Sequence, residues 1–492
     1  MEQKPIDVLY VTSEIAPFSK AGGVASVAGE LPPELKRQGV NIEILAPYYG
    51  PIEEKHNLKK IDGDYEIEFN GRKEQVQLYE RELDGVRVTF IKNETYFGTK
   101  QIHLHSDVPF EADARRFSFL SQACLSIVKS KQPRIVHVND WPFGYLLGLM
   151  KIEGVNANTV TTIHNLNYQG NIWRPIAPKI SSVMKTLMEH PYTSELFQDP
   201  RLEWDSVNPF RLALELSDVV NAVSPTYATE ILESEDQSRY FEGGKGLEGI
   251  IGRLCCQGKL IGISNGYIYN EKPTEENFRA MISKKRNARE EMSFALKKPE
   301  NLLFGFVGRA VEQKLKLLKE ELDGKPVIEH LLEIPEINFA FLGTGEKEYE
   351  EFLKQHHQGR NCSVIIDFDG GRANTINLGS DICLMPSIHE PCGITQLEAM
   401  ARATPPLVRW TGGLRDTVIG YPLDGATGFG FDANSREGVL RALINSVAEA
   451  KQVYYENPKK FLELKFNAFN TRFTWEDSAK RYIKEVYQNL LK

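Results

Sequence analysis

The chain has 492 residues, of which 41% are hydrophobic and 26% charged, and its formal net charge is −8. This length predicts more than one domain, and the composition is that of an ordinary globular protein. The negative charge argues against a nucleic-acid-binding protein that relies on a general basic field, and it favours a neutral or locally recognised ligand.

The N-terminal stretch MEQKPIDVLYVTSE runs directly into an apolar segment, without the basic region and cleavage site of a secretory signal. No run approaches the roughly 18 apolar residues of a membrane span. Six cysteines lack CxxC spacing and mostly lie in apolar runs, which indicates buried, reduced thiols and argues against a zinc site. We therefore expect a cytoplasmic protein; a plastid location would require that a transit peptide had been removed.

Short, β-branched-rich runs alternate with amphipathic stretches through the first half of the chain. The expected strands are 7–13, 41–47, 86–92, 134–139, 159–164 and 219–224, with a helix over 114–130. Most of these runs are continuously apolar, as in strands buried on both faces of a parallel sheet. Their alternation with helices predicts βαβ units.

A second series of the same kind begins after residue 300. The expected strands are 302–309, 338–345, 363–369, 382–387 and 405–410, with a helix over 436–450. The polar stretch 270–291 has no strand pattern and separates the two series. The sequence therefore predicts an α/β protein with two doubly wound halves and a cleft between them.

Ligands of such sheets bind at the carboxyl ends of the strands. After the first strand, Lys20 precedes Gly22 and Gly23. The glycines would let backbone N–H groups approach a ligand, and the lysine would add a point charge for phosphate or hydroxyl groups. A Gly-Gly pair alone more often marks only a tight turn.

Polar residues also follow two later strands that we expect to be neighbours. Asp140 follows 134–139, and His164 with Asn165 ends the run that begins at residue 159. A lone histidine at a strand end is more often structural than catalytic. An Asp, an Asn and a His together favour a site that hydrogen-bonds sugar hydroxyls.

In the second half, Arg309 directly follows an apolar strand, and Lys314 lies five positions later. Two fixed cations at a strand end are typical of a diphosphate site; the alternative is a solvated basic patch. A further glycine turn, 411–413, follows the run 405–410.

Glu390 follows the apolar strand 382–387 and precedes an expected helix. It could be an acid in the first turn of that helix, or it could belong to a ligand site at the strand end. Taken alone, the pattern leaves both readings open. Glu398 completes an E-x7-E spacing, and we expect it to pair with the scaffold.

Nine motifs occur in the order seen in bacterial glycogen synthases and plant starch synthases, and the chain resembles that family over nearly its whole length. They are SKAGGVASVAGELP, HVNDW, TIHNLNYQG, AVSPTYATEI, GLEGII, GISNG, GRAVEQK, MPSIHEPCGITQLEAM and RWTGGLRDTV. The resemblance implies the GT-B fold, with two Rossmann-like domains facing across a cleft. The expected domains are 1–262 on the acceptor side, 263–472 for the nucleotide sugar, and a C-terminal helix within 473–492 that returns to the first domain.

The resemblance further implies a retaining glycosyltransferase. It would move glucose from ADP-glucose, or less often UDP-glucose, to the non-reducing end of an α-1,4-glucan. The implied catalytic residues are Lys20, Asp140, His164 and Glu390. The implied substrate-binding residues are Gly22, Gly23, Asn265, Arg309, Lys314, Cys392, Gly393, Ile394 and Thr395. The nucleotide sugar is the substrate, and no cofactor, metal, nucleic-acid partner or membrane span is expected.

Several residues depart from the family pattern. Ser26, Pro142 and Ile268 stand where the family usually has polar or charged groups, and Ile388 and His389 replace an Arg and an aromatic residue. The segment 373–375 and Glu398 also differ. Two alternatives to a glucan synthase therefore stay open: a related transferase with a small-molecule acceptor, and a catalytically weak paralogue that binds sugar nucleotides.

Overall fold

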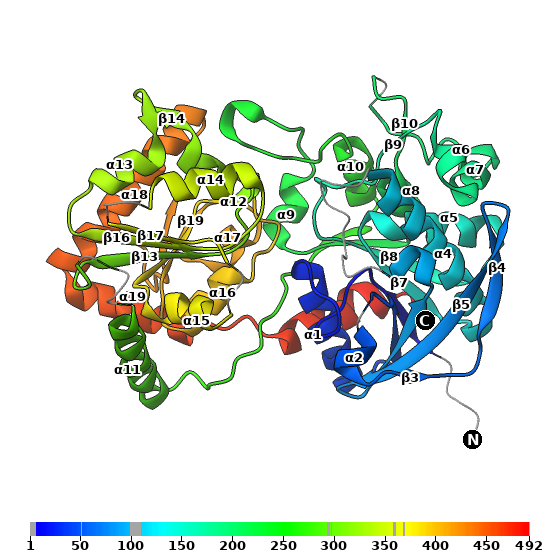
Figure 1. The fold of residues 1–492 in the computed structure, drawn as a ribbon, viewed down its shortest axis with the longest axis horizontal. Coiled ribbons are helices and arrows are strands. Elements are labelled where there is room, and N and C mark those ends of the chain that lie inside the picture. The colour runs from blue at the N-terminus through cyan, green and yellow to red at the C-terminus, as the bar shows by residue number, and fades with distance from the viewer. Residues whose placement is uncertain are drawn as a thin grey trace. The chain divides into compact units, whose positions relative to one another are not determined.

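The computed structural model describes residues 6–50, 52–98, 110–201, 203–292, 296, 298–357, 361–367 and 370–491. Figure 1 shows two compact units. Unit 1 comprises Met1–Ser234, Gly243–Gly266 and Trp475–Lys492, and unit 2 comprises Glu235–Glu242 and Tyr267–Thr474. The short excursion of the chain into unit 2 at 235–242 was not foreseen, and the sequence-based boundaries at 262 and 472 stay predictions.

The main sheet of unit 1 has the strand order β12-β11-β8-β7-β1-β2-β6-β5-β3. Its parallel strands are β1 (Val8–Val11), β2 (Ile42–Pro47), β6 (Val86–Lys92), β7 (Ile135–Asn139), β8 (Asn158–Ile163), β11 (Val219–Ala222) and β12 (Leu260–Gly262). Each of the six runs expected to be strands overlaps one of them. Most of these strands are buried along their length, which explains why their sequences do not alternate.

One edge of this sheet was missed. β5 (Arg72–Leu83) pairs antiparallel with β6, with β4 (Tyr65–Phe69) and with β3 (Lys59–Lys60). β4 and β5 carry many charged residues and are only partly buried, so they lack the continuous apolar run by which the other strands were recognised. The sheet is therefore mixed, with an antiparallel extension beyond β6.

Helices of unit 1 connect and cover these strands (Figure 1). They are α1 (Gly23–Arg37), α2 (Ile52–His56), α3 (Glu94–Phe97), α4 (Phe110–Lys131), α5 (Gly144–Ile152), α6 (Ala177–Ile180), α7 (Ser182–Glu189), α8 (Pro209–Glu215), α9 (Pro225–Glu230) and α10 (Glu248–Cys256). A 3-10 turn, η1 (Trp141–Phe143), follows β7, and β9 (Ile172–Trp173) pairs antiparallel with β10 (Ser206–Val207). The helix expected over 114–130 is α4.

Unit 2 contains a parallel six-stranded sheet in the order β17-β16-β13-β18-β19-β20. The strands are β13 (Leu302–Val307), β16 (Ile337–Leu342), β17 (Cys362–Ile365), β18 (Ile382–Met385), β19 (Pro406–Arg409) and β20 (Phe429–Phe431). Five were expected, although residues 368 and 369 of the expected strand 363–369 lie outside the described residues. The short edge strand β20 was not foreseen.

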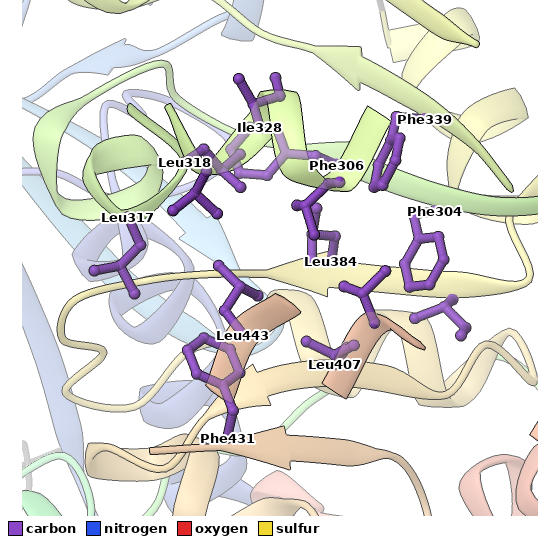
Figure 2. Packing of buried hydrophobic residues seen from close by; sticks show 14 of the residues in the cluster. Phe304, Phe306, Leu317, Leu318, Ile328, Phe339, Leu384, Leu407, Phe431 and Leu443 are labelled. Atoms are coloured by element: carbon purple, nitrogen blue, oxygen red, sulfur yellow. The ribbon is translucent and has the colours of Figure 1, made fainter. Parts of the chain in front are cut away.

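The helices of unit 2 contribute buried side chains to its core, together with the sheet. They are α11 (Glu275–Glu291), α12 (Glu312–Lys319), α13 (Val327–Glu333), α14 (Lys347–Gln355), α15 (Gly370–Gly379), α16 (Thr395–Ala401), α17 (Gly412–Thr417), α18 (Arg436–Glu456) and α19 (Pro458–Asn470). A 3-10 turn, η2 (Gln237–Arg239), and a two-stranded pair, β14 (Glu321–Leu322) with β15 (Lys325–Pro326), complete the unit. Figure 2 shows Phe304 and Phe339 of the sheet near Leu384 and Leu407, within a core that Leu443 of α18 also joins.

The C-terminal segment belongs to unit 1. It consists of α20 (Trp475–Arg481) followed by a π-helical stretch, Tyr482–Tyr487. Trp475 donates to Glu30 of α1 through Nε1, and the Ser478 hydroxyl donates to the backbone oxygen of Ser264. Tyr487 hydrogen-bonds His137 of β7 at 2.6 Å, so the segment is anchored beneath the centre of the sheet.

All six cysteines are free thiols, and four are buried as expected. Cys255 and Cys256, at the end of α10, are exposed. Across the described residues, every helix is too short or too polar to serve as a transmembrane span. The cytoplasmic location stays a prediction.

Candidate active site

Asp140 and His164 lie together because β7 and β8 are adjacent parallel strands, paired from Ile135 with Asn158 to Asn139 with Thr162. The Asp140 carboxylate accepts hydrogen bonds through Oδ1 from the backbone N–H of His164 at 2.7 Å and of Asn165 at 3.4 Å. The predicted clustering of these polar groups at neighbouring strand ends is therefore what the structure contains.

Asp140 has a strained backbone, with φ of 56° and ψ of −169°. Left-handed φ in a non-glycine residue costs roughly 1–3 kcal/mol and is concentrated at functional sites. Burial raises the pKa of the Asp140 carboxyl to about 7 against the opposing effect of its N–H donors, and the nearby Glu14 carboxylate raises it further. At neutral pH this carboxyl therefore exchanges between its charged and neutral forms.

His164 is held in one orientation by Asn139. Its Nε2 lies 2.9 Å from Asn139 Oδ1, and the Tyr10 hydroxyl donates to the same oxygen at 2.9 Å. Asn139 Nδ2 donates to the backbone oxygen of Val11, which fixes which end of the amide faces His164. Burial lowers the pKa of His164 to about 3, so the ring is neutral, with its proton on Nε2 and its lone pair on Nδ1.

The glycine-rich loop before α1 is arranged around Glu14, a residue that the sequence analysis did not single out. Glu14 is 2% exposed, and its Oε2 accepts from the N–H groups of Ala21 at 2.5 Å and Gly22 at 3.0 Å. The Gly22 amide was expected to be available to a ligand; instead it binds an internal carboxylate. Lys20 is exposed. The sequence pointed to it only through its position next to the two glycines.

Asn265 follows β12 and is buried. Its Oδ1 has no hydrogen-bond partner among the described residues. β12 is separated from β8 by β11. Asn265 thus follows the carboxyl end of its strand, as Asp140 and His164 follow theirs, but two strands farther along the sheet than His164, and its acceptor oxygen is buried and unpaired within the described part of the chain.

In unit 2, Glu390 and Lys314 form an ion pair. Glu390 follows β18 and Lys314 lies in α12, beyond the end of β13, and these two strands are parallel neighbours. The side chains are 11% and 17% exposed, and the Ser387 hydroxyl lies 3.3 Å from the same carboxylate oxygen of Glu390. Glu390 lies five residues before α16, so it is not an acid of that helix's first turn.

Arg309, the second cation expected at the diphosphate site, is more exposed than Lys314. Its side chain is exposed in the connection between β13 and α12. The two cations are thus present on one strand-to-helix connection, but Lys314 is already paired with Glu390. A phosphate bound by Lys314 would share that lysine with the carboxylate.

The turn at Gly412 and Gly413 supports the Glu390 loop by close backbone packing. The N–H of Gly413 donates to the backbone oxygen of Glu390 at 3.0 Å. A Cβ added at Gly412 would lie 2.1 Å from the backbone oxygen of Glu390, and one at Gly413 would lie 2.2 Å from the backbone oxygen of Cys392. These glycines are required because any side chain would push the loop away.

The segment between Glu390 and α16 is also fixed from within. Gly393 has φ of 74°, and Gln396 Nε2 donates to the backbone oxygens of Cys392 at 3.1 Å and Gly393 at 3.0 Å. Ile394 is the N-cap of α16, which Thr395 begins. The four residues expected to line the ligand thus form one rigid turn after Glu390.

Two family models match the chain. The starch synthase catalytic domain matches residues 7–253, and the glycosyl transferases group 1 model matches residues 288–461. The chain is 32% identical to a glycogen synthase of Clostridium novyi, with 99% of each chain covered. It is 33% identical to one of Clostridioides difficile, with 98% of this chain and 99% of that protein covered.

The chain belongs to the glycogen and starch synthase family of glycosyltransferases.

One solved structure supports the same assignment, and a second matches in fold alone. The catalytic domain of starch synthase IV from Arabidopsis thaliana, bound to ADP and acarbose, matches with a TM-score of 0.81 and 25% identity, covering 99% of this chain and 100% of that one. Sucrose-phosphate synthase from Thermosynechococcus elongatus matches in fold, with a TM-score of 0.58, 15% identity and 98% and 99% coverage. The predicted GT-B class, with two Rossmann-like parallel-sheet domains, is confirmed.

One further residue of this family member was missed beside the loop that carries Glu390. Arg409, at the end of β19, donates to the backbone oxygens of Ile388 at 2.6 Å, Tyr240 at 2.8 Å and Arg239 at 2.7 Å. It therefore ties the 235–242 excursion to the loop that carries Glu390. Arginine at the end of a buried strand was the only signal in the sequence.

The second glutamate of the E-x7-E spacing has a structural partner. Glu398 lies in α16 and pairs with Arg402 at 3.4 Å, as expected for a scaffold residue. Within the described part of this glycosyltransferase, no three His, Cys, Asp or Glu side chains are grouped so that they could hold a metal ion.

Proposed function

We propose that this protein transfers glucose from a nucleotide sugar, with ADP-glucose as the preferred donor, to the non-reducing end of an α-1,4-glucan with retention of configuration. The observation that carries the proposal is the Glu390–Lys314 pair at adjacent strand ends, in a chain that aligns along its length with glycogen synthases. The related starch synthase IV structure contains ADP and acarbose.

The residues of unit 2 supply charge and orientation. Lys314 and the exposed Arg309 would neutralise the diphosphate, which is where negative charge accumulates as the sugar leaves. Glu390 would accept hydrogen bonds from glucosyl hydroxyls. Its hydrogen-bonded pairing with Lys314 holds the carboxylate in position before the donor binds. The rigid turn of Cys392, Gly393, Ile394 and Thr395 would line the sugar and phosphates.

The residues of unit 1 would bind the sugar and stabilise its positive charge in the transition state. Asp140, when ionised, provides a carboxylate next to His164, and the neutral His164 offers Nδ1 as a hydrogen-bond acceptor for a hydroxyl. Lys20 and Gly23, at the start of α1, and the unpartnered Oδ1 of Asn265 are further candidates for polar contacts.

In the proposed step, the acceptor hydroxyl attacks the anomeric carbon from the face that the diphosphate leaves. The bond between that carbon and the phosphate oxygen breaks, the new glycosidic bond forms, and a phosphate oxygen takes the hydroxyl proton. Configuration is retained without an enzyme nucleophile, and the protein contributes preorganised charge.

A small-molecule acceptor is the second candidate, because two of the residues that differ from the family pattern, Pro142 and Ile268, are apolar. Pro142 is buried in η1, directly after Asp140, and Ile268 is 55% exposed. Ser26 is buried in α1. An apolar acceptor site discriminates weakly among hydroxylated substrates. Slow elongation of glucan with normal nucleotide binding would fit this candidate.

Calorimetry with ADP and UDP, followed by release of nucleotide from ADP-glucose and UDP-glucose, tests the proposal. The acceptors would be maltooligosaccharides, glycogen and a metabolite mixture. We expect ADP to bind more tightly and maltooligosaccharides to be elongated. Tight nucleotide binding with transfer only to a small metabolite would replace the glucan by another acceptor. Nucleotide binding without any transfer would identify a paralogue that only binds.

A further inference from the structure

One face of the main sheet of unit 1 carries five buried polar side chains, on the adjacent strands β1, β7, β8 and β11. Partner residues of adjacent strands point to the same face, as do residues two apart on one strand. Tyr10 pairs with His137, Asn139 with Thr162, and Thr162 with Asn221. These five side chains, which we call the polar layer, are each 0% or 1% exposed. Buried polar groups are costly unless they are hydrogen-bonded, so the polar layer needs partners on the face that it presents.

The last residues of the chain are anchored at the amino ends of β7 and β8. Asn158, the first residue of β8, donates through Nδ2 to the backbone oxygen of Leu490 at 2.7 Å. Arg134, directly before β7, donates to the backbone oxygen of Leu491. The carboxyl ends of the same two strands carry the candidate site of unit 1. The C-terminal segment is therefore fixed to the pair of strands that positions this site.

Two tyrosines of the π-helical stretch reach from the C-terminal segment into the polar layer. The Tyr482 hydroxyl lies 2.6 Å from the side-chain amide of Asn221, and the Tyr487 hydroxyl lies 2.6 Å from Nδ1 of His137. Residues five apart diverge on an α-helix with 3.6 residues per turn, but the wider π-helical turn leaves the two ring centroids 6.2 Å apart. The π-helical stretch thus directs both hydroxyls toward the sheet.

His137 connects Tyr487 to β8. Its Nε2 lies 2.7 Å from Thr162 Oγ1, while its Nδ1 faces Tyr487. Burial, with a smaller effect of the nearby His164, lowers the pKa of His137 to about 3, so the ring is neutral. A neutral imidazole donates from one nitrogen and accepts at the other, so each hydroxyl satisfies one of them. Without the Tyr487 hydroxyl, Nδ1 of a fully buried ring would lose this partner.

Tyr10 connects the ring of His137 to His164. The rings of Tyr10 and His137 are in edge contact, with centroids 4.8 Å apart and an interplanar angle of 65°. The Tyr10 hydroxyl donates to Asn139 Oδ1 at 2.9 Å, and the same oxygen lies 2.9 Å from Nε2 of His164. The path from Tyr487 to His164 thus passes through three buried side chains of the polar layer. In a close-packed core a shift of one of them displaces the next.

We propose that the C-terminal segment is a positioning element of the transfer reaction: the Tyr487 hydroxyl, through His137, Tyr10 and Asn139, holds His164 in the orientation in which it meets the donor sugar. The proposal rests on the proposed function, in which His164 binds that sugar. Tyr487 acts through other side chains rather than on the substrate. Its effect should therefore be on the rate of transfer and not on nucleotide binding, which the proposed function assigns to unit 2.

The test compares Tyr487→Phe and Tyr65→Phe with wild type in the full-length protein. Tyr65→Phe is the matched control, because the Tyr65 hydroxyl donates to the backbone oxygen of Ala123 at 2.6 Å and joins β4 to α4 within the same unit. Each variant loses one hydroxyl and one hydrogen bond, so both should have a similarly lowered Tm. We expect Tyr487→Phe to lower kcat about fivefold, with KM for the nucleotide sugar and Kd for ADP unchanged. Tyr65→Phe should retain the kinetics of wild type.

NMR spectra of the histidine ring nitrogens provide a readout at His164 itself, whose signals are assigned by comparison with His164→Gln. In wild type they should show a proton on Nε2 and none on Nδ1. In Tyr487→Phe we expect these signals to shift or broaden, and in Tyr65→Phe to stay as in wild type. Tyr482→Phe should have a smaller effect than Tyr487→Phe, because Tyr482 contacts β11, two strands away from β7.

Unchanged kcat and unchanged His164 signals in Tyr487→Phe would overturn the proposal and leave the polar layer with a structural role. A change in only one of the two would also overturn it, since the effect would then bypass His164 or would not matter to the reaction. Equal losses of kcat in Tyr65→Phe and Tyr487→Phe would do the same, because activity would follow stability alone. Failure of the proposed function is distinguishable: wild type would transfer no glucose, and the His164 signals would still test the path from Tyr487.

Discussion

Asn139 Oδ1 lies 2.9 Å from His164 Nε2, and this hydrogen bond fixes the tautomer of the histidine. The amide of Asn139 cannot turn over, because its Nδ2 donates to Val11 at 3.0 Å and its oxygen also accepts from Tyr10. The proton of the neutral ring therefore lies on Nε2. Nδ1 is left with a lone pair, which in the proposed function accepts from a substrate hydroxyl.

Replacing Asn139 should reduce turnover without unfolding the protein. In Asn139→Ala the ring of His164 loses its partner, and we expect kcat to fall by about tenfold or more, since loss of one oriented hydrogen bond costs roughly 1–3 kcal/mol. Tyr10→Phe removes only the second donor to Asn139 and should have a smaller effect. Steady-state kinetics with a parallel Tm measurement would show it.

Asn139→Asp distinguishes positioning from general stability. A carboxylate beside Nε2 favours the protonated ring and raises the pKa of His164 from its depressed value. The rate of transfer should then decline toward acid pH with an inflection that wild type lacks. Identical pH profiles for wild type and Asn139→Asp would mean that this hydrogen bond does not control the state of His164.

Removing the positive charge of Lys314 or of Arg309 should impair transfer. We expect Lys314→Ala and Arg309→Ala each to lower kcat by about two orders of magnitude, because in the proposed function each removes a preorganised stabiliser of the leaving diphosphate. Lys316→Ala, on the same helix and paired with Glu312, is the control and should behave as wild type. Near-normal turnover in Lys314→Ala with an intact fold would remove Lys314 from the site.

Transfer should depend on the ionisation of Asp140. The pKa of its carboxyl is raised to about 7 by burial, so the charged form that stabilises a cation-like sugar becomes populated as pH rises through 7. We expect kcat to rise over that range in wild type and to lose this inflection in Asp140→Asn. Glu14→Gln should move the inflection to lower pH, because it removes a neighbouring negative charge but retains an acceptor for the loop amides.

The raised pKa of the Asp140 carboxyl also makes the stability of the fold decrease as pH rises. In an unfolded chain an aspartate has a pKa of about 3.9, so between about pH 4 and 7 the folded protein binds more protons at Asp140 than the unfolded chain does. Its contribution is fully present below about pH 4 and is lost as pH rises through 7. Asp140→Asn should therefore gain Tm relative to wild type at pH 8 compared with pH 5, measured by calorimetry across that range.

Local sequence was sufficient to predict the strands that are buried on both faces. Val8–Val11 and Leu302–Val307 were recognised because their runs are continuously apolar, and polar groups directly after such runs were recognised as strand-end residues. Asp140 and His164 could be predicted as a pair because sequential βαβ strands are commonly neighbours. The charged, partly exposed strand Arg72–Leu83 has no such pattern and was missed.

Contacts formed only by the folded chain could not be predicted. Lys314 and Glu390 were both singled out, but they are 76 residues apart, and their ion pair depends on β13 lying next to β18. Glu14 closes on the amides of its own loop through a reversal of the chain that its sequence does not indicate. Arg409 likewise acts on backbone oxygens of two distant segments.

The close packing of Gly413 against the Glu390 loop allows a steric test of the proposed nucleotide site. A methyl group at this position would lie 2.2 Å from the Cys392 oxygen, which is backbone and cannot move without shifting the loop. We expect Gly413→Ala to weaken ADP binding by about tenfold or more and to lower transfer, since a displacement of about 1 Å at a reacting site can cost a hundredfold in rate.

Gly252→Ala is the matched control. Gly252 lies in α10, where an added Cβ would meet no neighbouring segment within 4 Å. The variant should retain full activity with a gain in stability of about 0.5–1 kcal/mol. Calorimetric titration with ADP and thermal unfolding of both variants decide the matter, and tight ADP binding by Gly413→Ala would show that the Cys392–Thr395 turn does not hold the nucleotide.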